Sequence, residues 1–427
     1  MNGEARKQTV LITGLNGLIR AMGFLLRVVL ARLLGAEMMG IAELASGVHM
    51  LAITPLTSGL PMAISRLTAK ETADRAHMPL LAGQRLVRLV SIVLIPVFLL
   101  LSPLIAKLMG DIRVLPSLWC TAPCVLILGY SGVYNGYCYG TKRSSLPAVS
   151  ELVEQTLRLI FTLLLVHWLK SLTPGWLAAV PVASTMLAEA AGLLLVVFWL
   201  RIPLSGREDA SAWQGPILRL ALPTTVTRLI HTLLRSVTSI MIPLRLAASG
   251  LPASEATARL GMLNGMVLPM MMLPCIFTGA LNMVMAPRLA QSEENTRHCK
   301  RLLTKLLATG LLVSLLCGGL LALLAPFISN RIYRLPELTP LFLLSLPLCI
   351  LCATENLTVG TITSLGLQKA AMYGAMPASL LSLVLTWVLT AMPHLRLTGV
   401  IISLAAGHLI DIFWNSIVLY RWWQAQT

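Results

Sequence analysis

Arginine residues interrupt apolar segments of this sequence at a repeated spacing. Arg20 and Arg27 are seven residues apart, and Arg228 and Arg235 repeat that spacing 208 positions later. Seven residues at 100° each return to within about 20° of the starting direction, so each pair shares one helix face. Charged residues in apolar helices usually face a cavity or a partner. The pattern indicates an anion site lined by all four arginines; the alternatives are snorkelling to the membrane interface and structural ion pairs.

Acidic residues form a second pattern. Glu151, Glu154 and Arg158 stand at i, i+3 and i+7 on one face, and Glu154 to Arg158 has the favourable i, i+4 order for an ion pair. A self-neutralised helix is therefore the expected structure there. Further single acids lie in apolar segments at Glu43, Glu189, Glu355 and Asp411. Each is a candidate for carrying a proton or binding a cation, against the alternative of a local hydrogen bond.

Other chemistry finds no support in the sequence. It contains no nucleotide-binding P-loop, no spacing typical of metal ligands and no nucleophile constellation. The Cys349-x-x-Cys352 pair could form a redox or metal site, but no histidine and no second cysteine pair accompany it, so packing within a membrane helix is expected. We therefore expect no cofactor, no metal, no energy coupling by ATP within this chain and no enzymatic activity.

The elements that position these residues are apolar helices. Of the 427 residues, 56% are hydrophobic and 12% are charged, and the mean hydropathy is +0.81; soluble domains carry about 25% charged residues. A span needs roughly 20 apolar residues. The sequence predicts an all-α polytopic membrane protein with about twelve transmembrane helices. They are expected at roughly 9–34, 38–62, 86–108, 114–137, 146–168, 176–200, 217–246, 260–286, 302–328, 338–359, 370–391 and 397–420.

The net charge of +16 comes from 33 Lys and Arg against 17 Asp and Glu. Loops on the side of the N-terminus, such as those around Arg75 and Arg143, carry about twice the Lys and Arg of the opposite loops, such as those around Arg113 and Lys170. Both termini are therefore expected in the cytoplasm, with the first span retained rather than cleaved as a signal peptide. The remaining positive charge favours an anionic substrate or membrane lipid. A nucleic-acid partner is not expected, because no soluble domain or basic tail is evident.

The two halves of the sequence repeat each other. GLPMAISRLTAKE at 59–71 matches ALNMVMAPRLAQSEE at 280–294, and GTKRSSLPAVSELVE at 140–154 matches GLQKAAMYGAMPASL at 366–380. The offset is 208 for the paired arginines and 222 between Arg66 and Arg288, so an insertion is expected at 248–258. An even number of spans in each half predicts lobes at 1–206 and 207–427 related by a pseudo-twofold axis along the membrane normal.

Six stretches carry a resemblance to a known family. They are GFLLRVVLARLLGAEMMGIAEL, SGLPMAISRLTAKE, YNGYCYGTKRSSLPAVSELVEQTLRL, LALPTTVTRLIHTL, GMLNGMVLPMMMLPCIFTGAL and LGLQKAAMYG, which run from the first span to the eleventh. The sequence resembles the stage V sporulation protein B group of polysaccharide exporters. That group belongs to the multidrug/oligosaccharidyl-lipid/polysaccharide (MATE/MOP) flippase superfamily, with the lipid II flippase (MurJ/MviN) as a cousin.

The resemblance implies a V-shaped pair of six-helix lobes around a central cavity, and alternating access for a lipid-linked sugar diphosphate. The family's cationic cavity corresponds to Arg20, Arg27 and Arg228, with Arg235 added by the repeat. The two further C-terminal spans that many members carry, which form a lipid-facing groove in the lipid II flippase, are not expected here.

We therefore expect a flippase or exporter that moves an undecaprenyl-diphosphate-linked oligosaccharide or peptidoglycan precursor across the bacterial cytoplasmic membrane. Proton or sodium coupling at Glu43, Glu151, Glu154, Arg158 or Asp411, and association with cell-wall or glycan-synthesis enzymes, belong to this expectation. A role in sporulation and one in vegetative growth both stay open. The alternatives are a cation-coupled antiporter for drugs or other organic cations, and a scaffold that recruits glycan enzymes.

Overall fold

The computed structural model describes residues 3–72, 74–202, 210–291 and 296–424, and every regular element within these ranges is a helix. Eight of the described helices are long and apolar enough to cross a membrane, and a ninth span results if Ala253–Met271 and Pro274–Asn282, bent by 44°, count as one. The chain is therefore a multi-span membrane protein. Each expected span overlaps a helix, but 9–34, 38–62 and 146–168 fall outside those nine, so the count of twelve stays a prediction.

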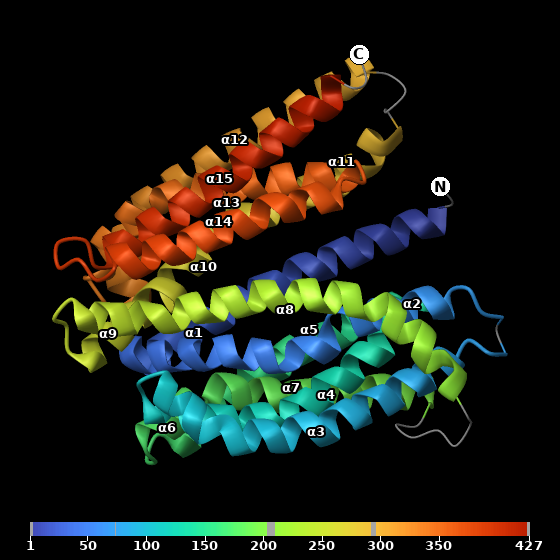
Figure 1. The fold of residues 1–427 in the computed structure, drawn as a ribbon, viewed down its shortest axis with the longest axis horizontal. Coiled ribbons are helices and arrows are strands. Elements are labelled where there is room, and N and C mark those ends of the chain that lie inside the picture. Colours follow the sequence, from blue (N-terminus) through green and yellow to red (C-terminus); the bar gives the residue numbers. More distant parts are fainter. Residues whose placement is uncertain (1–2, 73, 203–209, 292–295, 425–427) are drawn as a thin grey trace. The chain divides into compact units, whose positions relative to one another are not determined.

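Helix α1 (Gly3–Thr57) contains the first reversal of the chain. It is helical on both sides of Gly35, whose backbone is not helical (φ 74°, ψ 176°). Figure 1 shows the chain running from the N-terminus to this point and then back towards α2 (Gly59–Thr68). The two expected spans at 9–34 and 38–62 therefore correspond to the two arms of α1, and the second arm continues through the break at Ser58 into α2.

The chain divides into two compact units, Met1–Ile240 and Met241–Thr427. In the first unit the remaining elements are α3 (Met78–Leu108), η1 (Ile112–Val114), α4 (Leu115–Gly140), α5 (Ser145–Leu169), α6 (Pro174–Ala178), α7 (Val180–Leu200) and most of α8 (Ser211–Ala248). Helix α4 is central, because it packs against α1, α2, α3 and α7, while α7 also packs against α5. The side chains of Leu118, Val125 and Tyr134 of α4 are buried in the core of this unit.

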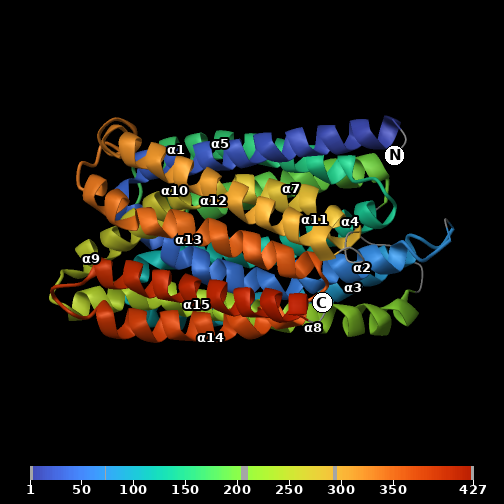
Figure 2. The same ribbon diagram turned by 90° about the horizontal axis from the view of Figure 1, so that it is seen from above.

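The second unit begins with a broken span made of α9 (Ala253–Leu260), the π-helix η2 (Gly261–Val267), α10 (Leu268–Met271) and α11 (Pro274–Gln291). It continues with α12 (Thr296–Phe327), the π-helix η3 (Ile328–Tyr333), α13 (Leu338–Ser364), α14 (Gln368–Leu389) and α15 (Leu397–Gln424). Helices α14 and α15 run side by side in both views (Figures 1 and 2). Helix α13 packs against α11, α12 and α15.

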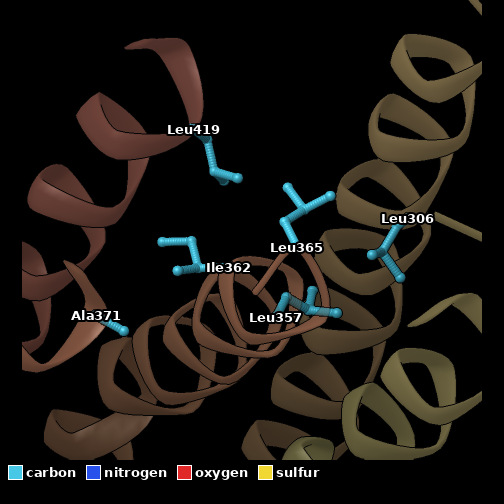
Figure 3. Close-up of a cluster of buried hydrophobic side chains, with 6 residues drawn as sticks. All are labelled: Leu306, Leu357, Ile362, Leu365, Ala371 and Leu419. Carbon is cyan, nitrogen blue, oxygen red and sulfur yellow. The ribbon is translucent and has the colours of Figure 1, made fainter. Parts of the chain in front are cut away.

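A cluster of buried aliphatic side chains holds one end of the second unit together (Figure 3). Leu357 and Ile362 of α13 meet Leu306 of α12 on one side and Leu419 of α15 on the other, with Leu365 and Ala371 closing the cluster. All six are at most 9% exposed. Within a bilayer, such close packing and small residues associate helices, because lipid tails are as apolar as leucine.

The two units share one packing plan. In the first, α4 contacts α2, α3 and α7, and α7 contacts α5; in the second, α13 contacts α11, α12 and α15, and α15 contacts α14. This is the order of neighbours expected if the sequence halves are repeats. The pseudo-twofold axis and the lobes at 1–206 and 207–427 stay predictions, and the boundary expected at 206/207 lies outside the described residues.

Apolar side chains also cover the outside of both units. Leu100 of α3 is 81% exposed, Phe198 of α7 78% and Leu323 of α12 80%. A water-soluble protein rarely exposes contiguous apolar surface on this scale. These faces match the hydrocarbon of a bilayer, and the charged residues inside the same helices must therefore be explained one by one.

Candidate functional site

The four arginines predicted to bind an anion all lie in the first unit, on α1 and on the part of α8 that belongs to it. Helix α8 packs against the second arm of α1 through small and polar residues. The Ser236 hydroxyl donates to the Gly47 carbonyl at 2.7 Å, and the Thr54 hydroxyl lies 3.5 Å from that of Thr232. Small side chains let the backbones approach closely, which is typical of membrane helix pairs.

Glu43 joins these two helices electrostatically. Arg27 Nη1 lies 3.9 Å from Glu43 Oε1, and Arg235 is the other cation that acts on this carboxylate. The Glu43 side chain is 22% exposed and that of Arg27 is 50% exposed. Arg27 and Arg235 stand at equivalent positions of the predicted repeat, so one acid lies near both of them. Glu43 is thereby a partner of the basic residues rather than a free acid.

Arg20 and Arg228, one repeat position earlier, have exposed side chains. Among the described residues no ion pair is recorded for either of them, nor for Arg235 within 4.0 Å. Glu43 therefore faces Arg27 and Arg235, while Arg20 and Arg228 have no ion-pair partner among the described residues. The expected common cavity for all four residues stays a prediction.

The expected ion pair within α5 is wrong. Arg158 Nη2 lies 3.3 Å from Glu189 Oε1 on α7, and Glu154 instead accepts a hydrogen bond from the Ser150 hydroxyl at 2.8 Å. Glu154 is 7% exposed and faces Gly192 of α7, whereas Glu151 is exposed. The i, i+4 rule describes isolated helices; here a carboxylate on the neighbouring helix competes for the guanidinium. The two helices carry three carboxylates, Glu151, Glu154 and Glu189, and one permanent cation, Arg158.

The second unit holds a cluster that sequence reasoning missed. His408 of α15 places Nε2 3.3 Å from the Cys352 Sγ of α13, and its Nδ1 is hydrogen-bonded to Glu355 Oε2. Asp411, one turn after His408, is 3% exposed and lies beside Glu355 and His408. The packing role expected for Cys352 is therefore incomplete, whereas Cys349 is buried.

The residues of this cluster lie far apart in the sequence, so no single motif identifies them. Glu355 and Asp411 stood out as single acids, but only the packing of α13 against α15 brings His408 between them, 53 residues from Glu355 in sequence. No group of three or more His, Cys, Asp and Glu side chains in the described part of the chain is arranged to hold a metal ion. The cluster therefore consists of acids and bases that face one another.

Comparisons with known proteins agree with these features. The profile of the polysaccharide biosynthesis protein family matches residues 5–293, about two thirds of the chain. This chain belongs to that family. Its membership confirms the resemblance that the six sequence stretches indicate.

Two curated relatives come from Bacillus subtilis (strain 168). Stage V sporulation protein B is 25% identical over 419 residues, which cover 94% of this chain and 80% of that protein. Sporulation protein YkvU is 22% identical over 416 residues, covering 91% and 88% of the two chains. Both relatives are described as sporulation proteins.

The fold is that of MOP superfamily transporters. The inward closed form of the lipid II flippase MurJ matches with a TM-score of 0.76 and 13% identity, covering 96% of this chain and 87% of that one. An inward-facing multidrug resistance MATE family transporter matches with a TM-score of 0.72 and 15% identity, covering 94% and 95%. The chain is thus a multi-span membrane protein of the polysaccharide biosynthesis protein family, with a fold that these two proteins share.

Proposed function

We propose that this family member is a flippase that moves an undecaprenyl-diphosphate-linked oligosaccharide or peptidoglycan precursor across the bacterial cytoplasmic membrane by alternating access. Both termini lie in the cytoplasm, and glycan-synthesis enzymes supply the substrate. The family of polysaccharide biosynthesis proteins and the fold shared with a lipid II flippase support the substrate class.

One observation carries the proposal to particular residues. Arg27 and Arg235 act on a single acid, Glu43, while Arg20 and Arg228 extend the same two helix faces with exposed guanidinium groups. Like charges gathered on apolar helices are unfavourable until an anion neutralises them. A diphosphate does so with charge-assisted hydrogen bonds, and a planar guanidinium can donate two of these at once. The lipid tail then stays in the bilayer while the sugar follows the diphosphate.

The alternative, an antiporter for drugs or other organic cations, fits these residues less well. It requires an acid that is free to receive a cationic substrate. Glu43, the acid nearest to the arginines, already faces Arg27 and Arg235. An organic cation would have to displace guanidinium groups tethered to the same helices.

The test is flipping of a fluorescent undecaprenyl-diphosphate-linked sugar by the purified full-length protein in phosphatidylglycerol–phosphatidylethanolamine vesicles, normalised to folded protein. Arg20→Ala and Arg228→Ala should abolish flipping, and lysine at either position should restore only part of it, because a lysine lacks the bidentate fork. The matched control is Arg32→Ala, which removes an exposed arginine from the same arm of α1. Full flipping by the Arg20→Ala, Arg228→Ala double variant would refute the proposed site. Efflux of an organic cation by the wild-type protein, without flipping, would favour the antiporter.

A further inference from the structure

The cluster between α13 and α15 lies at the middle of both helices. Cys352 and Glu355 are close to the centre of the 27-residue helix α13, and His408 and Asp411 are close to the centre of the 28-residue helix α15. A charge at the centre of a span is costly, and ionisable residues there are usually functional. None of these four side chains takes part in the arginine site proposed above, which lies in the other unit.

The cluster contains more acidic than basic side chains. His408 interacts with Cys352 and Glu355 of α13 through hydrogen bonds and charge. Asp411 interacts in turn with Glu355 and His408. Helix α14, which also packs against α15, adds no charged group; its Gly374 faces Asp411 and Trp414, while Lys369 and Tyr373 are exposed. With both carboxyls ionised and His408 protonated, the cluster carries a net negative charge inside an apolar unit.

The hydrogen bonds show where a proton is lacking. Asp411 lies within hydrogen-bonding reach of Glu355, yet its Oδ1 is fully buried and receives no hydrogen bond. Two ionised carboxylates side by side repel each other, whereas a proton on one makes it a donor to the other. One proton held between Asp411 and Glu355 therefore removes the excess charge and supplies the missing hydrogen bond.

The first unit also holds buried acids beside a base, but each of its buried carboxyls has a partner of its own. There Glu154 accepts a hydrogen bond from the Ser150 hydroxyl, Glu189 pairs with Arg158, which stays protonated, and Glu151 is exposed. In the second unit the base is His408, which Glu355 orients through Nδ1, and the carboxyls of Asp411 and Glu355 lie within hydrogen-bonding reach of each other. Of the two clusters, the one in the second unit therefore contains the carboxyl pair that a single shared proton would satisfy.

We propose that Glu355, His408 and Asp411 form a proton-binding site, in which Asp411 and Glu355 share one exchangeable proton beside the His408 imidazolium. Release of that proton to water leaves the site with one net negative charge, and binding restores neutrality. The proton is thereby the coupling ion of transport, and this link rests on the function proposed above; the proton site itself does not.

The first test needs no transport. Infrared difference spectra of the full-length protein in phosphatidylglycerol–phosphatidylethanolamine bilayers, recorded between two pH values, should contain the carbonyl band of a buried carboxylic acid. Asp411→Asn should remove that band, and His408→Gln should shift the pH at which it appears. Glu337→Gln and His394→Gln, which alter exposed residues of the same unit, should leave it unchanged. Circular dichroism checks folding, and Glu355→Gln replaces Asp411→Asn if that variant does not fold. A band that persists in a folded variant of either carboxyl would refute the site.

The second test distinguishes the proton-coupling role from the arginine site of the proposed flippase. Vesicles that contain the protein and a trapped pH-sensitive dye report proton movement when an undecaprenyl-diphosphate-linked sugar is added. Asp411→Asn should lose this proton movement while still binding undecaprenyl diphosphate, and Arg20→Ala should lose binding while keeping the infrared band. Proton movement that survives in Asp411→Asn and Glu355→Gln would overturn the coupling role. Loss of binding only in the arginine variants would leave the proposed flippase site intact.

Discussion

Arg27 and Glu43 are each eight residues from Gly35, on opposite arms of α1, and Arg27 Nη1 lies 3.9 Å from Glu43 Oε1. The reversal at Gly35 therefore sets the register in which these two charges meet. A residue inserted in either arm next to the turn would rotate one of them away by about 100°. The geometry of the basic site thus depends on a backbone conformation at a residue that carries no charge.

Gly35 should tolerate no other residue. Its φ of 74° and ψ of 176° lie in a region that is almost restricted to glycine, where another residue costs about 1–3 kcal/mol. Gly35→Ala should lower the thermal stability and the yield of folded protein. Gly35→Asn should be no better, because asparagine tolerates the left-handed helical region but not this one. Gly17→Ala, in the helical part of the same arm with open space around it, is the control and should not destabilise the protein. Normal stability of Gly35→Ala would show that the turn can be rebuilt.

Gly192→Ala should destabilise the packing of α5 against α7. A methyl group there would collide with the Glu154 carboxyl, and the Ser150 hydroxyl that holds Glu154 also lies 3.2 Å from the Gly192 carbonyl. Overpacking of this kind costs about 1–3 kcal/mol. Thermal unfolding in detergent measures the effect, with Gly319→Ala of α12, which meets no neighbour within 4 Å, as the control. Equal unfolding temperatures for the two variants would contradict the contact.

Removal of the Arg158 charge should cost more than removal of an exposed one. Arg158 and Glu189 are 19% and 13% exposed, and breaking a buried pair costs about 3–5 kcal/mol, less where water reaches it. Arg158→Met should therefore lower the unfolding temperature strongly, and adding Glu189→Gln should recover part of the loss. In the control, Arg259→Met breaks a pair with Glu255 whose side chains are 37% and 43% exposed. That loss should stay below about 1 kcal/mol. A larger loss of stability in Arg259→Met than in Arg158→Met would show that burial does not determine how much these ion pairs contribute to stability.

The loop around Arg75 should face the cytoplasm. A single cysteine at position 75, in a variant without native cysteines, should react with a membrane-impermeant maleimide only after the cells are opened. A cysteine at Lys170, in the loop between α5 and α6, should react from outside in intact cells. The expectation rests on the excess of Lys and Arg in loops on the side of the N-terminus. Labelling of position 75 in intact cells would reverse the orientation.

The helices could be predicted from the sequence because a span requires a long apolar run, and each expected span overlaps a helix. The interaction partners of the charged residues were harder to predict from the sequence. Arg158 was assigned to Glu154 by a rule for isolated helices, whereas packing offers it Glu189 on α7. His408 was not predicted as a functional residue, because its partners Cys352 and Glu355 belong to another helix. They contact His408 only when α13 packs against α15. Sequence periodicity gives the face of a helix on which a residue lies, and the neighbouring helix decides what that residue meets.

The common packing plan around α4 and α13 has an evolutionary consequence. Helices that duplicate with their neighbours inherit the same shape constraints, so their small and apolar contact residues can change only together. Polar residues at the centre of the bundle are freer to diverge, provided that each copy keeps its own charge balance. In this chain Arg158 is the cation between α5 and α7, and His408 lies among the acids between α13 and α15. If the two halves arose by duplication, they have kept a common packing plan while their charged residues came to differ.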